Sequence, residues 1–236
     1  WENPKSLFDY NNILVVEKAK IRTFTKHPGW DENHYPHSKQ WIAQLARQAD
    51  WKHFPNTHKK AITINTTALR IFPTNKPSFG DRHTAGQGFP FDNFQVSQLR
   101  ANFPVYVLQT SKNGAWAFVL TSNETYGWVQ TKDLASVNNN FINRWKTKNY
   151  VTPVVDDVSI RNQQQYFFQT RIGEIYPFVR AEKNNDIILV ATRDQNGRAV
   201  IKQAAVHKAA VKPWPIRATS KKIAKLANEF LGIPYG

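Results

Sequence analysis

The sequence predicts a mainly β protein that contains two small barrels, with helical segments near both of its ends. Short runs of alternating apolar and polar residues recur between turn signals from Ala61 onward, which is typical of strands. These runs are short and closely spaced, and this favours small barrels over a layered α/β fold. Amphipathic stretches preceded by Ser or Thr, one near each end of the chain, predict capped helices.

Composition narrows the class of partner. Of the 236 residues, 41% are apolar, which suffices for packed cores. Lys and Arg number 32 against 17 Asp and Glu, so the formal net charge is +15. Such a surface attracts polyanions, whether nucleic acid, anionic lipid headgroups or cell-wall polymer. Nucleic-acid binding rests on charge alone, because the sequence shows no helix-turn-helix spacing, zinc-finger ligands or basic zipper.

Two absences limit the chemistry further. No run approaches the ~18 apolar residues of a membrane span, so we expect none. The 236 residues include no Cys, which excludes a disulfide, a thiolate metal site and a cysteine nucleophile within them. The chain begins at Trp1 rather than Met, so we expect it to be processed or trimmed.

Residues 1–60 are expected to form a small N-terminal segment. The run Ile13–Val16 predicts a short strand, and Lys26–Trp30 predicts a turn. Ser38 is expected to cap a helix from Lys39 to about Trp51, whose apolar residues recur at helical spacing.

A polar cluster precedes this helix and allows two interpretations. Asp31, Glu32, His34 and His37 form either a metal site or a polar loop. The two histidines would share one face only on a helix, and Pro36 between them opposes a helix, so the loop is favoured.

The first barrel is predicted over residues 61–137. Alternation and turn signals place strands at 61–65, 68–72, 105–108, 116–120 and 127–129. Lys112-Asn-Gly114 and the segment from Asn123 to Tyr126 are the expected turns. Between the second and third of these strands runs a long Pro- and Gly-rich excursion, Pro73 to Asn102. Loops of this length tend to be functional.

The second barrel is predicted over residues 138–213. Phe141–Trp145 is expected to be a short helical connector, and strands are predicted at 150–155, 158–160, 167–168, 172–179, 187–191 and 199–201. Lys212–Pro215 reads as a stiff linker, because proline fixes φ. Thr219 or Ser220 then caps a final helix, and Gly232 is its expected left-handed stop.

The order of these motifs resembles NlpC-type bacterial cell-wall peptidases with two SH3-like domains. Gly127-Trp-Val129 resembles the closing strand of the first SH3-like domain, and Ile172-Gly-Glu-Ile175 and Arg193–Gly197 resemble the second. The run from Ile223 to Gly236 resembles the opening of the catalytic domain, before the family's Trp-Gly-Gly and its cysteine. The resemblance implies a mainly β fold of two SH3-like β-barrels, preceded by an N-terminal clip (1–60) and followed, from residue 214, by the first helix of a truncated α+β papain-like peptidase domain.

The resemblance also implies a function. Members of the family cut peptidoglycan stem peptides between D-glutamate and a diamino acid with a cysteine nucleophile, here expected beyond Gly236, and need no cofactor. This chain would then be the accessory, wall-binding and substrate-restricting portion of a periplasmic or secreted enzyme, inactive alone and monomeric, with murein peptides as partners. The alternative is a non-catalytic peptidoglycan-binding module with SH3-like domains.

Site residues follow from the same resemblance. In these enzymes the first barrel borders the catalytic cleft, so Asp81 or Asp92 would meet a substrate ammonium and Arg82 a carboxylate. Asn93 and Gln95 lie in the same excursion. Asp92 and Asn93 have a purely structural alternative, since Asx side chains commonly bind turn backbone groups. Tyr235 matches a family tyrosine beside the active site, and no residue of this chain is expected to be a metal ligand.

Overall fold

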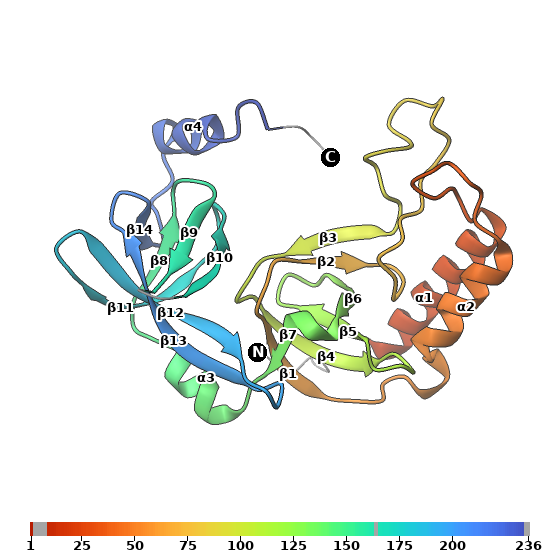
Figure 1. Cartoon of the computed structure of the whole chain (residues 1–236), viewed down its shortest axis with the longest axis horizontal. Helices are drawn as coiled ribbons and strands as arrows, with labels where there is room; N and C mark the ends of the chain where they lie inside the picture. Colours follow the sequence, from red (N-terminus) through yellow and green to blue (C-terminus); the bar gives the residue numbers. More distant parts are fainter. Residues whose placement is uncertain (2–8, 163–164, 234–236) are drawn as a thin grey trace.

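The structure, a computed structural model, describes residues 1, 9–162 and 165–233 and begins with two packed helices (Figure 1). Helix α1 (Tyr10–Lys26) starts at Asp9, whose side chain accepts a hydrogen bond from Asn11 N. The expected strand at Ile13–Val16 is therefore wrong. Ile13, Ile21 and Phe24 lie at helical spacing and pack on the protein, and this burial outweighs the β preference of a short branched run.

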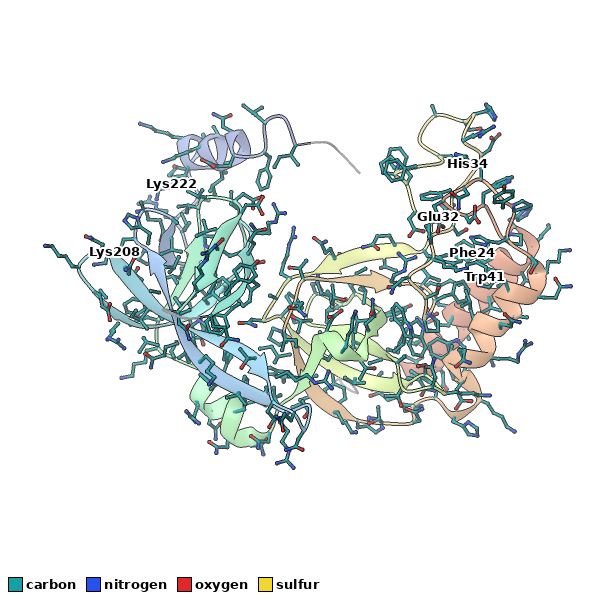
Figure 2. The ribbon with its side chains drawn as sticks, in the orientation of Figure 1. Phe24, Glu32, His34, Trp41, Lys208 and Lys222 are labelled. Atoms are coloured by element: carbon teal, nitrogen blue, oxygen red, sulfur yellow. The ribbon has the colours of Figure 1, made fainter. Side chains whose placement is uncertain are left out.

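The helix predicted to follow Ser38 is confirmed as α2 (Lys39–Ala49). The Ser38 side chain accepts from Trp41 N at its start, and Ile42, Leu45 and Ala49 are buried. Figure 2 shows Phe24 and Trp41 between the helices and the rest of the protein, where both contact the ring of Phe94. A short 3-10 helix, η2 (Trp51–His53), follows.

The first sheet has seven strands in the order β3-β2-β6-β5-β4-β1-β7, and all of its pairings are antiparallel. The strands are β1 (Lys59–Thr63), β2 (Thr67–Arg70), β3 (Gln95–Leu99), β4 (Pro104–Thr110), β5 (Trp116–Thr121), β6 (Tyr126–Gln130) and β7 (Leu134–Ser136), with η3 (Thr131–Asp133) before the last. Five were predicted. Strands β3 and β7 were not, so the excursion ends at Phe94 and leaves a loop of residues 71–94, here called the β2–β3 loop.

Both faces of this sheet are covered. Leu69, Val119 and Val129 belong to the core enclosed by the curved sheet. Phe118 and Trp128 lie on the other face and pack with Ile13 and Ala49 of the N-terminal helices. The helical segment thus supplies the second layer that a sheet with two apolar faces needs.

The second sheet repeats the strand order of the first. Its order is β10-β9-β13-β12-β11-β8-β14, which is that of the first sheet shifted by seven strands. The strands are β8 (Tyr150–Pro153), β9 (Val158–Arg161), β10 (Tyr166–Thr170), β11 (Tyr176–Ala181), β12 (Asn185–Arg193), β13 (Ala199–His207) and β14 (Val211–Trp214). The expected linker at Lys212–Pro215 is therefore partly wrong, because Lys212–Trp214 pairs with β8.

The two barrels are packed together. Helix α3 (Asn139–Trp145), the predicted connector, buries Phe141, Ile142 and Trp145 in a cluster shared with both sheets. Asn102 bridges the barrels, because its side chain accepts from Ala191 N at 2.9 Å and donates to Ala191 O at 3.1 Å. Ser136 N also donates to Gly197 O at 2.9 Å. The barrels therefore form one framework.

Helix α4 (Ser220–Asn228) ends the described chain. Thr219 caps it by accepting from Lys222 N, and Gly232 takes the expected positive φ of 82°. None of its side chains is buried, and Ile223 is 59% exposed. In Figure 1 the β2–β3 loop and α4 project on the same side of the molecule, above the first and second barrels. Among the described residues, none of the helices has the length and apolar character needed to cross a membrane.

Candidate substrate-binding site

The β2–β3 loop is fixed against the N-terminal segment by backbone pairing. Trp30 N donates to Phe79 O at 3.1 Å, and Phe79 N donates to Trp30 O at 2.9 Å. Ser78 Oγ donates to Pro28 O at 2.8 Å beside Gly29. Gly29 has a φ of +76°, and a side chain there would come within 2.4 Å of Ser78 Oγ. The contact therefore requires glycine at this position.

The base of the loop is held by an ion pair. Arg70, at the end of β2, is 5% exposed and donates to Asp92 Oδ2 at 2.7 Å, to Gln95 Oε1 at 3.2 Å and to Lys76 O at 2.9 Å. Asp92 Oδ1 accepts from Ser78 N and Phe94 N, both at 2.9 Å. Both Asp92 oxygens are thus engaged, one by Arg70 of β2 and one by backbone groups of the loop, and the latter matches the structural alternative for this residue.

Asp81 and Arg82 lie at the exposed end of the loop. They line a hollow of about 230 Å³ together with Trp30, His34, Gly80 and His83. Asp81 Oδ1 accepts from His83 N at 3.0 Å, and Arg82 Nε donates to His83 Nε2 at 3.1 Å. Asp81 Oδ2 and the two Arg82 Nη groups have no hydrogen-bond partner in the described part of the chain, so both signs of charge face this hollow.

A second hollow adjoins the first. It measures about 430 Å³, shares Trp30 and Gly80 with the first, and is also lined by Asn93, Phe79 and Gln87. Of the five residues predicted to bind substrate, the structure therefore places Asp81, Arg82 and Asn93 on two joined hollows. It places Asp92 and Gln95 beneath them, on Arg70.

The polar cluster before α2 shapes one wall of this site. Asp31 Oδ1 accepts from Asn33 N at 2.9 Å and from Tyr35 N at 2.8 Å, which makes the segment a tight polar loop. His37 lies 2.8 Å from Pro77 O and stacks on Trp41. Figure 2 marks Glu32 and His34 beside the β2–β3 loop. Over the residues described, no three or more His, Asp or Glu side chains are grouped to hold a metal.

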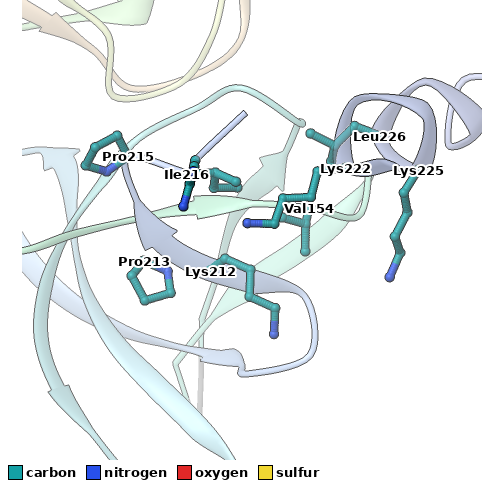
Figure 3. A pocket seen from close by; sticks show the side chains of 9 residues that line it. Val154, Lys212, Pro213, Pro215, Ile216, Lys222, Lys225 and Leu226 are labelled. Atoms are coloured by element: carbon teal, nitrogen blue, oxygen red, sulfur yellow. The ribbon is translucent and has the colours of Figure 1, made fainter. Parts of the chain in front are cut away.

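A separate basic hollow lies between α4 and the second barrel. Figure 3 shows Lys212, Lys222 and Lys225 around it, with Val154 and Leu226 supplying apolar walls. Its volume is about 380 Å³, and Arg217 lines it as well. Four basic side chains line this hollow and, among the residues that the structure describes, no acidic one does, so its surface attracts anions.

Sequence reasoning missed several residues of the loop site. Trp30, Phe79 and Gln87 join segments that lie about 50 residues apart in the chain, and no local pattern marks such a pairing. Arg70 was noted only as part of a strand. The available signal is a charged residue in an otherwise apolar strand. Such a residue, when buried, needs a partner of opposite charge from another part of the chain. Tyr235 lies outside the described residues.

Comparison with known proteins identifies the two barrels. Residues 77–130 match the SH3 domain of the SH3b1 type, and residues 138–183 match the SH3 domain of the SH3b2 type. Among solved structures, an NlpC/P60 endopeptidase from Photobacterium damselae subsp. piscicida superposes with a TM-score of 0.84 at 27% sequence identity. The match covers 95% of this chain.

The chain carries two SH3 domains, one of the SH3b1 type and one of the SH3b2 type, and is similar in structure to an NlpC/P60 endopeptidase. It spans about half of the solved endopeptidase, 49% of that chain. Among proteins of curated function, none matches the sequence. The comparisons confirm the predicted fold class and the predicted resemblance to NlpC-type peptidases with two SH3 domains.

Proposed function

We propose that this chain is the accessory portion of a secreted or periplasmic bacterial cell-wall endopeptidase. In this proposal the SH3 domains bind peptidoglycan, and the β2–β3 loop restricts which stem peptides reach a cysteine peptidase domain that follows Gly236. The bond cut is that between D-glutamate and the diamino acid. The observation that carries the proposal is the superposition on an NlpC/P60 endopeptidase over 95% of the chain.

The placement of the loop supports substrate restriction. The β2–β3 loop and α4 project on the same side, so a domain continuing from α4 lies within reach of the loop. A murein peptide carries ammonium and carboxylate groups, and the open oxygen of Asp81 and the guanidinium of Arg82 offer the complementary charges. Asp92 and Gln95 act through Arg70, by holding the loop in place.

Digestion of muropeptides by the full gene product tests the enzyme proposal. We expect cleavage after D-glutamate that a thiol-alkylating reagent abolishes, since a thiolate is the proposed nucleophile. A full product that contains no reactive thiol and releases no peptide would contradict it. The alternative, a non-catalytic binding module, would then hold. In that case we expect the protein to bind intact sacculi, which co-sedimentation measures.

The loop residues need a separate test in the full enzyme. Asp81→Ala combined with Arg82→Ala is expected to raise KM at least about a hundredfold, because each of the two lost charged contacts weakens binding by roughly 1.5–3 kcal/mol. Arg47→Ala, on the exposed face of α2, is the matched control. If the double variant keeps the KM of the parent, these residues do not contact substrate.

A further inference from the structure

A third hollow lies between the two barrels and shares no residue with the loop site. It measures about 260 Å³. The first barrel contributes Asn65, Thr66 and Gln98, and the second contributes Tyr166 and Gln169. Its volume falls just below the ~300–1,000 Å³ of typical small-molecule pockets, which suits a single ring rather than an extended chain. We call it the inter-barrel groove.

The lining of the groove is rich in uncharged hydrogen-bonding groups. A side-chain amide supplies two donors and an acceptor. Gln169 and Thr66 are exposed and have no side-chain partner among the residues that the structure describes. Tyr166 is 53% exposed and offers an aromatic ring beside them, with the guanidinium carbon of Arg161 5.8 Å from the ring centroid. Amides, a hydroxyl and an aromatic ring together suit a ligand with both hydroxyl groups and an apolar ring face.

The cations of the groove are already engaged, unlike those beneath α4. Arg171 donates to Asp156 at 2.5 Å and to Asp157 at 2.8 Å. Arg100 donates to Gln98 Oε1 at 2.5 Å and lies within electrostatic range of the buried Glu174. Of these two arginines only Arg171 is paired with carboxylates, so the groove keeps the charge of Arg100 but is less selective for anions than the hollow beneath α4, which four cations line.

The groove is also preformed. Asn102 and the cluster around α3 hold the two barrels together, so the walls do not depend on a ligand to bring them into place. Phe168 and Tyr176 pack as stacked rings in the core behind β10, which fixes that wall. A preformed site loses less entropy when it binds.

We propose that the inter-barrel groove binds one uncharged, N-acetylated sugar residue of the glycan strand of peptidoglycan. The inference rests on the proposed wall-binding function and assigns its sugar-binding part. Peptidoglycan offers a charged component, the stem peptide, and a component rich in hydroxyl and acetamido groups, the glycan. The charges of Asp81 and Arg82 suit the first, and the uncharged polar side chains of the groove, with the exposed amide of Gln169 among them, suit the second. One molecule would then engage both components at separate sites.

Titration of the 236-residue chain with two probes tests the proposal. The sugar probe is a tetramer of N-acetylglucosamine, and the peptide probe is free L-alanyl-γ-D-glutamyl-diaminopimelate. By NMR we expect the tetramer to shift the side-chain amides of Asn65, Gln98 and Gln169, and the peptide to leave them in place. Gln169→Ala and Tyr166→Ala should each weaken tetramer binding about fivefold, because each removes one hydrogen-bonding or ring contact.

Controls keep the result interpretable. Gln44→Ala removes an exposed amide from α2 and should bind the tetramer like the parent chain. Tyr166→Phe keeps the ring and should retain most of the affinity. Absence of tetramer binding, equal binding by all variants, or peptide shifts at the groove would overturn the inference. Sedimentation with sacculi separates the two proposals: if the chain binds sacculi but not the tetramer, wall binding stands and the sugar site fails.

Discussion

The guanidinium of Arg70 lies 2.7 Å from the carboxylate of Asp92 and joins the end of β2 to the far end of the β2–β3 loop. The side chains are 6% and 15% exposed, so the pair is largely removed from water. Asp92 uses its other oxygen to hold the backbone at Ser78 and Phe94. The loop's conformation thus depends on one buried charge in the barrel.

Removing that charge should destabilise the protein strongly. Arg70→Met leaves Asp92 buried without its cation, which typically costs about 3–5 kcal/mol. Urea unfolding measures the free energy, and hydrogen exchange of residues 77–94 shows whether the loop is released. Arg47→Met, at an exposed position, should stay within about 0.5 kcal/mol of the parent. A small effect at Arg70 would mean that the loop is held by its apolar contacts and its backbone pairing with Trp30.

Gly29 and Gly86 form a matched pair for testing the junction between the N-terminal segment and the loop. Both have a φ of +76°, but a Cβ at Gly29 would meet Ser78 Oγ and Phe79 O, whereas one at Gly86 meets nothing within 4 Å. Gly86→Ala should therefore cost only the backbone strain, about 1 kcal/mol. Gly29→Ala should cost at least about 2 kcal/mol more and speed exchange at Phe79 N. Equal losses would show that the close approach is easily relieved.

Glu174 gives a pH-dependent prediction. Burial raises the pKa of its carboxyl, although Thr170 and Tyr176 donate to it. The folded state therefore holds this proton more tightly than the unfolded state. Its stabilising contribution is complete below the ordinary value of about 4.5 and is lost as pH rises through the raised folded value.

Glu174→Gln removes this titration. The variant should match the parent near pH 4 and unfold at a higher temperature at pH 7, because the neutral amide avoids burying a charge. Thermal unfolding at several pH values measures the difference, and Glu32→Gln, at an exposed position, should show none. A variant that is less stable than the parent at pH 7 would indicate that the charged carboxylate is the favoured form.

Asn102 should set the coupling between the barrels. Its φ of +63° suits Gly, so Asn102→Gly keeps the backbone but removes the bonds to Ala191 and should cost about 2 kcal/mol. Asn102→Ala adds backbone strain of about 1 kcal/mol. Calorimetry should show the unfolding transition broaden or split. Glu124→Gly, another position of positive φ but exposed, should leave it unchanged.

Local signals predicted the parts of the fold that depend on local chemistry. The caps at Ser38 and Thr219 and the positive φ of Gly114 follow from side chains next to the elements they shape. Helix α1 was missed because the branched run from Ile13 favours strand locally, whereas its burial against Trp128 is a contact across the chain.

The site was predicted only in outline. The length of the excursion marked it as functional, and Asp81, Arg82 and Asn93 do line its hollows. The role of Asp92 depends on Arg70, 22 positions earlier, and the wall supplied by Trp30 depends on a pairing with Phe79. Neither pairing has a signature within a sequence window. The inter-barrel groove depends on the contact between the two barrels, and no local sequence pattern predicts that contact.

The two sheets have the same strand order but differ in the length of one connection. In the second sheet the strands equivalent to β2 and β3 end at Arg161 and begin at Tyr166, whereas in the first sheet they end at Arg70 and begin at Gln95. The barrel plan therefore does not require the long connection. A change in the length of this loop therefore leaves the strand order of the first sheet possible, while the second barrel needs no matching change.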